Sequence, residues 1–297
     1  MMTKVRVGLI GLGRFGRLHA EILASLPEVE LAAVCDVRPE VLTEVATEFG
    51  VPIHVSDYEV LLAGTAALDA VLIATSDPSH APIAKLALER GLHVFVEKPL
   101  AISYHEASEL ARTAREAGRH LQVGFVLRYE PRHAYLKEQI GAGRLGHLAT
   151  LRLKRHVPQA WFHTYGRTVH PMLESTIHDI DLCVWYIGTP CQRVYAVDRS
   201  FLGLDRPDTS LAILEFEGGT VAVVDASWLL PAGAPQTTPE LGGTIDASLE
   251  IVGTEATARL DFLNPSFSVW TREGTAYPEL SLWPHLMGSV QIGRAHV

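Results

Sequence analysis

A regular alternation of apolar and amphipathic segments across the first 125 residues most constrains the fold. Strand-like apolar runs occur at 4–10, 30–36, 68–75, 93–97 and 121–126. Continuous apolar runs are typical of parallel strands that are buried on both faces. The segments between them have helical periodicity and stop at residues such as Gly50, Gly91 and Gly118. The pattern predicts an α/β fold with a doubly wound parallel sheet.

The pattern changes after residue 125. Helical segments at 131–143 and 171–188 flank an alternating strand at 147–157, and mostly strands follow. Alternation of apolar and polar residues is typical of antiparallel sheets with one solvated face. We therefore expect a first domain over 1–123 and a second, α+β domain over 124–297 with a large, mostly antiparallel open sheet.

Gly11, Gly13 and Gly16 form a GxGxxG motif between the first strand and the first helix. Three glycines alone can be ordinary turn residues, but this position indicates a dinucleotide site. Gly11 permits a tight turn, Gly13 lets the backbone approach a pyrophosphate, and Gly16 lets helix and strand pack closely. Asp36 ends the second strand, where a carboxylate binds ribose hydroxyls and repels a 2′-phosphate. NAD is therefore expected rather than NADP, although Arg38 could accept that phosphate.

The segment 93–97 is followed by Lys98 and Pro99. A lysine at a strand end is usually solvated. Lys98, however, is expected at the carboxyl edge of the sheet, where ligands of doubly wound sheets bind. Pro99 also restricts the backbone of the residue before it. These features make Lys98 a candidate catalytic cation.

Glu174 and His178 are four residues apart in a predicted helix, so we expect them to share a face. Such a pair can simply stabilise the helix. It can also supply acid–base chemistry, because imidazole titrates near neutral pH. The residues alone leave both interpretations open.

Several motifs together resemble one family. The glycine motif is followed by DPSHAPIAKLALERGLHVFVEKPLA, GFVLRYEP, GRLGHL and IHDIDL. The chain is similar over nearly its whole length to the Gfo/Idh/MocA family, named after glucose–fructose oxidoreductase, inositol dehydrogenase and a rhizopine-catabolism protein. The resemblance implies that Lys98 and His178 meet at the nicotinamide, with His178 as acid and base and Lys98 stabilising the alkoxide. Many members carry aspartate where this chain has Glu174, which leaves the best substrate open.

The resemblance implies an NAD-dependent oxidoreductase acting on a secondary hydroxyl of a sugar, cyclitol or sugar derivative, with inositol as the nearest specific guess. The first domain would bind NAD, and the second would bind substrate and form a homodimer or homotetramer through its open sheet. Two rivals stay open: an NAD-dependent glycoside hydrolase of the same fold, and a non-enzymatic nucleotide-sensing regulator.

The predicted site residues form three sets. The catalytic residues are Lys98, His178 and Glu174. The cofactor contacts are Gly11, Gly13, Arg14, Phe15, Gly16, Asp36, Arg38, Thr75, Ser76, His80, Glu97 and Lys98, with His80 expected to have a structural part in its loop. The substrate contacts are Arg128, Arg155, Trp161 and Arg167. The segment 155–171, rich in arginine, histidine and aromatic residues, reads either as a solvated loop or as a lid over a sugar.

Composition excludes several other classes of function. The net charge of −9, without any basic run, argues against nucleic acid as the main partner. Three cysteines without CxxC spacing favour a reduced, cytoplasmic setting. No apolar run reaches the roughly 20 residues that span a bilayer. A metal held by Glu174 and nearby histidines is disfavoured, because no compact pair such as HExxH occurs. The final residues 292–297, IGRAHV, read as a translated sequencing adapter, so we hypothesise a truncated chain with an artefactual tail.

Overall fold

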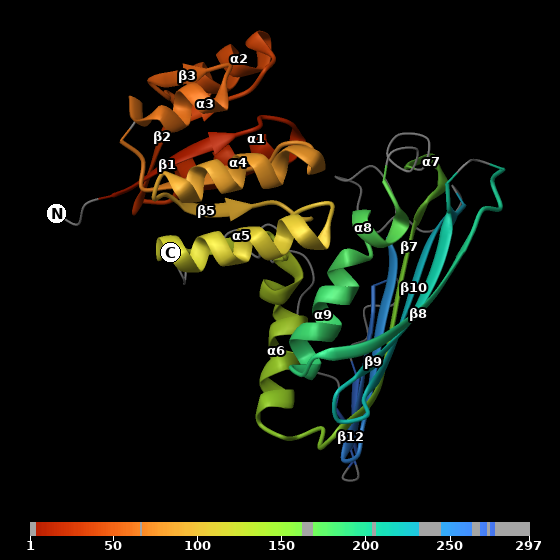
Figure 1. Ribbon diagram of the computed structural model, residues 1–297. Coiled ribbons are helices and arrows are strands. Elements are labelled where there is room, and N and C mark those ends of the chain that lie inside the picture. Colours follow the sequence, from red (N-terminus) through yellow and green to blue (C-terminus); the bar gives the residue numbers. More distant parts are fainter. Residues whose placement is uncertain are drawn as a thin grey trace. The chain divides into compact units, whose positions relative to one another are not determined.

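A computed structural model describes residues 4–65, 67–161, 169–203, 206–231, 245–262, 268–271 and 274–276. Arg167 and the suspected tail at 292–297 lie outside these residues. The chain divides into two compact units, Met1–Phe125 and Val126–Val297 (Figure 1).

The first unit is built on a six-stranded sheet in the order β3-β2-β1-β4-β5-β6. The strands are β1 (Val5–Ile10), β2 (Val29–Cys35), β3 (Ile53–Val55), β4 (Ala70–Ile73), β5 (His93–Val96) and β6 (Leu121–Val123). All neighbouring strands are parallel, which confirms the predicted doubly wound sheet. The sequence pattern does not single out β3, since three residues are too few to show a period.

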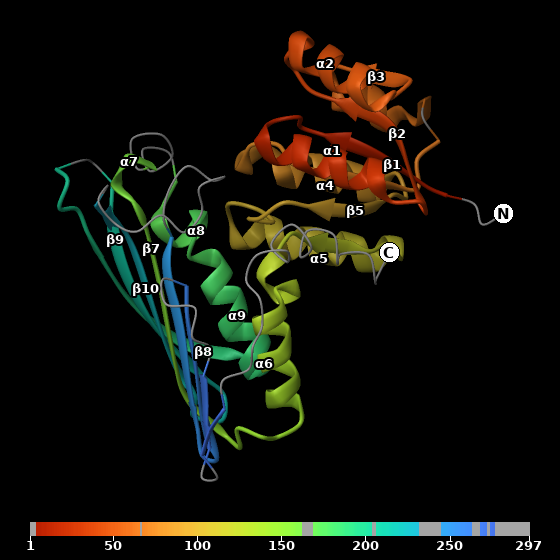
Figure 2. The same ribbon diagram turned by 180° about the vertical axis from the view of Figure 1, so that it is seen from behind.

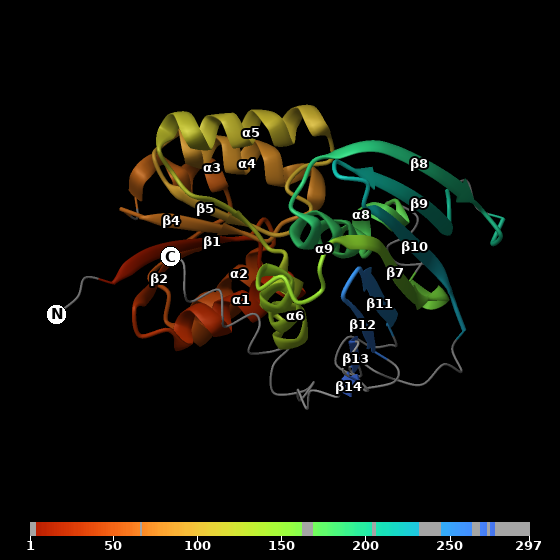
Figure 3. The ribbon, with the colours of Figure 1, turned by 90° about the horizontal axis from the view of Figure 1, so that it is seen from below.

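Helices cover both faces of this sheet (Figure 3). Helices α1 (Arg14–Ser25) and α2 (Pro39–Phe49) pack in one apolar cluster, and α4 (Asp77–Glu89) and α5 (Tyr104–Ala117) pack in another. The short α3 (Tyr58–Val60) and a π-type turn at Leu61–Thr65 connect β3 to β4. Gly50 and Gly118 end α2 and α5 in the left-handed conformation, as their sequence positions predict.

The second unit is built on an eight-stranded sheet in the order β14-β13-β12-β11-β7-β10-β9-β8. The strands are β7 (Leu148–Pro158), β8 (Cys191–Arg199), β9 (Thr209–Phe216), β10 (Val221–Leu230), β11 (Asp246–Gly253), β12 (Ala256–Asp261), β13 (Ser268–Thr271) and β14 (Gly274–Ala276). Neighbours are antiparallel except β7 and β10. The sheet is thus mostly antiparallel, as predicted.

Helices α6 (Pro131–Gly141) and α9 (Ile177–Ile187) lie on the same face of this sheet (Figure 2). Their apolar side chains, such as Leu136 and Leu182, form one core with Leu151 and Leu153 of β7. The connecting elements are a 3-10 turn at Val126–Tyr129 and the short helices α7 (Gln159–Trp161) and α8 (Pro171–Glu174). Along β9, every second side chain is buried in this core, and the others are exposed or partly exposed.

The single helix predicted over 171–188 is wrong, because the chain forms two helices, α8 and α9. Ser175 and Thr176 separate them in a turn. The His178 N–H donates to the carbonyl of Ser175, three residues back, at 3.3 Å. Serine and threonine are weak helix formers, and the tighter turn with its three-residue hydrogen bond changes the direction of the chain between the two helices.

Candidate active site

In the turn between β1 and α1, close packing against the backbone accounts for two of the three motif glycines. Gly11 has φ of +91°, and a Cβ there would lie 2.5 Å from the Ala74 carbonyl oxygen. A Cβ on Gly16 would lie 1.9 Å from the Gly11 carbonyl oxygen. Around Gly13, by contrast, a Cβ would meet no described atom within 4 Å. The space over Gly13 is therefore open to a ligand at the N-terminus of α1, where the helix dipole favours an anionic group.

The end of β4 lies against the same turn. A Cβ on Gly11 would come within 2.8 Å of the Thr75 backbone nitrogen. The Thr75 hydroxyl is buried without a hydrogen-bond partner in the described part of the chain. Ser76 is the exposed N-cap of α4. A buried hydroxyl without a partner, at the edge where β1 and β4 diverge, fits a contact with a bound ligand.

Asp36 lies buried just after β2 and accepts hydrogen bonds on both carboxylate oxygens. The Leu12 N–H donates to Oδ2 at 2.7 Å, which ties Asp36 to the glycine turn. The half-exposed Arg38 guanidinium donates to both oxygens at 3.0 Å. Burial alone would raise the pKa of Asp36, but the hydrogen bonds from Arg38 and Leu12 outweigh it and the pKa is lowered. Asp36 is therefore a carboxylate at neutral pH.

Lys98 follows β5 at the carboxyl edge of the sheet, and two buried histidines bond to the residues on either side of it. The Lys98–Pro99 peptide bond is cis. His80 of α4 is 1% exposed and places Nδ1 2.7 Å from the Pro99 carbonyl oxygen and Nε2 3.1 Å from the Thr75 carbonyl oxygen. His80 thus joins the loops after β4 and β5.

The second histidine is His19 of α1, which sequence reasoning missed. Its Nε2 lies 2.7 Å from Glu97 Oε1, and both side chains are largely buried. The other Glu97 oxygen accepts the Lys98 backbone N–H at 3.2 Å. The sequence feature that could have indicated a buried His19 is its place on the apolar face of α1, beside Ala20 and Leu23. Glu97, expected at the cofactor, has both carboxylate oxygens engaged inside the first unit.

In the second unit, Glu174 closes α8 and His178 is the second residue of α9. Both side chains are partly buried. Because of the turn at 175–176, they belong to consecutive helices and do not share one helical face.

The predicted substrate residues differ in their surroundings. Arg155 of β7 is 6% exposed and donates to both oxygens of Asp179 at 2.6 and 3.0 Å. Arg128 donates to both oxygens of Asp181 at 2.8 and 2.5 Å, and these hydrogen bonds raise the pKa of Arg128. Trp161 ends α7, but its side chain lies outside the described residues, as does Arg167.

Comparison with known proteins identifies the family. Residues 5–125 match the oxidoreductase family with an NAD-binding Rossmann fold, and residues 133–259 match the GFO/IDH/MocA C-terminal domain. The chain belongs to the Gfo/Idh/MocA oxidoreductase family. The predicted family, the oxidoreductase class acting on CH–OH groups, and NAD as cofactor are confirmed.

Relatives of this oxidoreductase include proteins with named substrates. The scyllo-inositol 2-dehydrogenase (NAD(+)) of Bacillus subtilis is 31% identical over 86% of this chain and 73% of its own length. The myo-inositol 2-dehydrogenase of Thermotoga maritima is 31% identical over 75% of this chain and 68% of its own length. The structure of UDP-N-acetylglucosamine 3-dehydrogenase from Acidithiobacillus ferrooxidans matches with a TM-score of 0.82 at 28% identity, covering 100% of this chain and 91% of that one.

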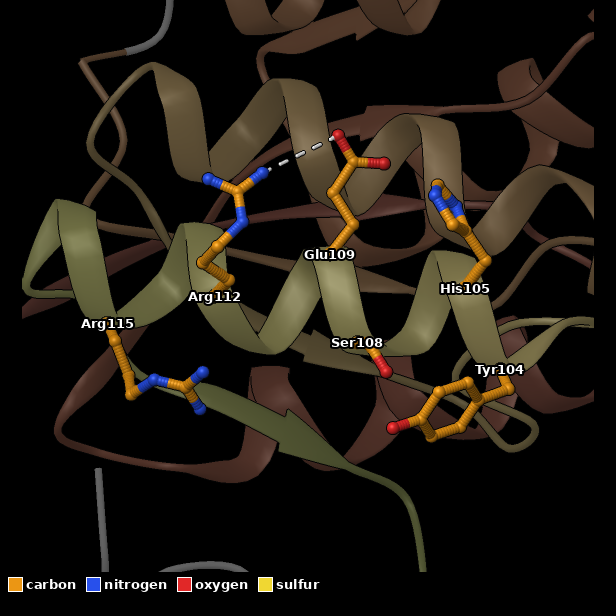
Figure 4. A pocket seen from close by; sticks show the side chains of 6 residues that line it. All are labelled: Tyr104, His105, Ser108, Glu109, Arg112 and Arg115. Atoms are coloured by element: carbon orange, nitrogen blue, oxygen red, sulfur yellow. Dashed lines mark ion pairs between the residues drawn. The ribbon is translucent and has the colours of Figure 1, made fainter.

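A hollow of about 440 Å³ on the outer surface of α5 holds none of the predicted site residues (Figure 4). Its lining residues are Tyr104, His105, Ser108, Glu109, Arg112 and Arg115. Glu109 is paired with Lys85 at 2.7 Å and lies 4.0 Å from Arg112. No helix in the described part of this oxidoreductase is long and apolar enough to span a membrane.

Proposed function

We propose that this oxidoreductase transfers a hydride between NAD and a secondary hydroxyl of a cyclitol, sugar or sugar derivative, with an inositol as the nearest substrate. The observation that carries the proposal is the place of Lys98. It follows β5 at the carboxyl edge of the NAD-binding sheet, flanked by Glu97 and Pro99, which bond to buried histidines. The names of the inositol dehydrogenase relatives support the substrate class.

The residues present fit NAD. Gly13 leaves room for the pyrophosphate, and the first turn of α1, with Arg14 and Phe15, offers N–H groups to it. The buried Thr75 hydroxyl offers a hydrogen bond at the edge between β1 and β4. Asp36 would accept from the ribose hydroxyls once Arg38 moves aside, and its charge disfavours NADP. Bound NAD supplies the acceptor for the hydride that leaves the substrate carbon.

Oxidation of an alcohol also requires removal of the hydroxyl proton. In the proposed mechanism His178 takes that proton as general base, and returns it in the reverse direction. The Lys98 ammonium donates a hydrogen bond to the same oxygen, whose developing negative charge it stabilises. Glu174 would orient the substrate hydroxyl or His178.

A substrate screen tests the proposal. The full chain would be mixed with NAD and each of myo-inositol, scyllo-inositol, glucose and UDP-N-acetylglucosamine, and NADH formation would be followed by absorbance. Formation of NADH with an inositol, lost in Lys98→Met and His178→Asn, is the expected result. In a parallel assay with an aryl glycoside, release of the aglycone without net NADH would instead favour the hydrolase. NAD binding without turnover of any polyol or glycoside would favour the regulator.

The outward face of the second sheet supports the proposed homo-oligomer. Tyr195, Leu211 and Ile213 lie on adjacent strands β8 and β9 of this face and are 65%, 45% and 40% exposed. Neighbouring Val223 of β10 extends the same row. A second copy of this chain would cover this apolar patch.

The thiols are compatible with the proposed reduced, cytoplasmic setting. All three cysteines are free, and Cys35 and Cys183 are buried. Burial raises the pKa of Cys35 to about 12, so this thiol is inert at neutral pH.

A further inference from the structure

We infer that Arg155 and Asp179 are positioning residues whose buried ion pair fixes the rotation of α9 and thereby the aim of His178. The Arg128–Asp181 pair acts on the other side of the same helix. The inference rests on the proposed role of His178, and a double-mutant cycle distinguishes a failure of that role from a failure of the positioning by Arg155.

The first pair anchors α9 to the centre of the second sheet. Arg155 lies on β7, between β10 and β11, with its backbone opposite Ala226 and Ala247. Its side chain shares the buried face of β7 with Leu153 and Val157. Asp179, in the first turn of α9, is 3% exposed. The bidentate contact therefore joins a central strand directly to the turn that carries His178.

The second pair anchors α9 to the chain that enters the second unit. Arg128 lies in the 3-10 turn at Val126–Tyr129, and its guanidinium carbon is 5.8 Å from the centre of the Trp185 ring. Asp181 is 8% exposed. The guanidinium is thus held by Asp181 and by an aromatic ring of the next helical turn.

The helical geometry places His178 between these two anchors. Each residue advances about 100° around an α-helix, so Asp179 lies about 100° from His178 in one sense. Asp181, three residues on, lies about 60° away in the opposite sense. Rotation of α9 in either sense would break one bidentate pair. A planar guanidinium that binds both carboxylate oxygens resists such rotation better than a single bond does.

Stability alone does not account for a buried pair at Arg155. Burying both charges removes them from water, and an apolar pair of similar volume is often as stable or more so. The bidentate ion pair instead fixes the orientation of α9, and with it the orientation of His178. Acid–base chemistry depends on it, because a misplacement of about 1 Å can lower a rate about 100-fold.

The test is a double-mutant cycle between Arg155 and His178. Arg155→Lys keeps the charge but loses the bidentate contact. In the wild-type background we expect it to lower kcat for the inositol substrate about tenfold or more with KM for NAD unchanged. In the His178→Asn background it should have no further effect, because the group that it positions is gone. Arg152→Lys is the matched control: Arg152 lies on the same strand as Arg155, its side chain is exposed and pairs with Glu250 of β11, and the variant should leave kcat unchanged.

Folding is measured in the same proteins. All five tryptophans lie after residue 160, so their fluorescence reports unfolding of the second unit. The double variant R155M/D179L replaces the pair by apolar side chains and should unfold at a denaturant concentration close to that of the wild type, yet with low kcat. Wild-type kcat in this folded variant would overturn the inference. Failure of both R155K and R155M/D179L to fold would also overturn it, since the pair would then serve folding.

The two proposals fail in different ways. If His178→Asn retains full kcat, the proposed acid–base role is wrong. Suppose that His178→Asn lowers kcat, and that adding Arg155→Lys lowers kcat further by the same factor as in the wild-type background. The role of His178 then stands. In that case the positioning by Arg155 is wrong.

Discussion

Among the predicted site residues, Lys98 is the one whose substitution we expect to lower kcat most directly. Lys98→Met keeps most of the length of the side chain and removes its charge. We expect kcat to fall by about 100-fold or more, because a developing alkoxide would lose its hydrogen-bond donor. The dissociation constant of NAD, measured by thermal shift, should change little. Wild-type kcat in this variant would mean that Lys98 is an ordinary solvated lysine.

Asp36 decides cofactor choice at the residue scale. Asp36→Asn removes the charge that disfavours a 2′-phosphate while keeping an acceptor for the Leu12 N–H. Binding of NAD should weaken about tenfold or more, and binding of NADP should improve. Arg38→Ala is the control: it leaves the carboxylate in place, so NAD binding should persist. Stronger NAD binding by Asp36→Asn would contradict the assignment.

His133 gives the second unit a pH-dependent stability. The ring is 2% exposed, and its Nδ1 lies 2.8 Å from the Tyr186 hydroxyl. Burial, aided by the positive charges of Arg132 and Arg155, lowers the pKa of His133 to about 3. An unfolded histidine titrates near 6.5, so between these pH values only the unfolded state binds the proton. Stability is therefore lost as the pH falls from about 6.5 towards 3.

Tryptophan fluorescence during denaturant unfolding measures this effect. His133 should contribute up to about a tenfold loss in the folding equilibrium per pH unit within that range. His133→Gln should be less stable at neutral pH but should lose less stability on acidification. Parallel acid losses in both proteins would contradict the neutral, buried ring.

At the scale of elements, the β1–α1 turn offers a matched pair of glycine variants. Gly13→Ala places its Cβ in space that no described atom occupies, so the first unit should fold but bind NAD weakly. Gly16→Ala places its Cβ 1.9 Å from the Gly11 carbonyl oxygen, so the helix must move off the strand. We expect loss of folded first unit, seen by limited proteolysis. Equal NAD binding by wild type and Gly13→Ala would mean that the cofactor does not approach this turn.

The break between α8 and α9 shows where an element-scale prediction failed. Apolar periodicity continues from Met172 through Leu182 to Trp185, so the pattern alone supports one helix. Periodicity reports which side faces a core but is insensitive to one tightened turn. Here two weak helix formers, Ser175 and Thr176, let the chain bend, and Thr176 is fully buried at the bend.

At the scale of the whole molecule, the outward sheet face predicts self-association. Ile213→Arg places a charge in the middle of the apolar row on β9. If a second copy covers this row, the variant should shift from dimer or tetramer to monomer in size-exclusion chromatography with light scattering, with little change in unfolding. A monomeric wild-type protein would contradict the proposed oligomer.

Most of the strands and helices of the first unit, the glycine turn and the position of Lys98 were readable from the sequence, because each depends on local periodicity and turn chemistry. Which charges pair was not readable. His19 bonds to Glu97 across 78 residues, and Arg155 bonds to Asp179 across 24. The sequence does not distinguish an arginine that is solvated from one that binds a substrate or forms an ion pair with an aspartate. Only the tertiary structure decides this, since the packing of helices on the sheets determines which partner each buried charge meets.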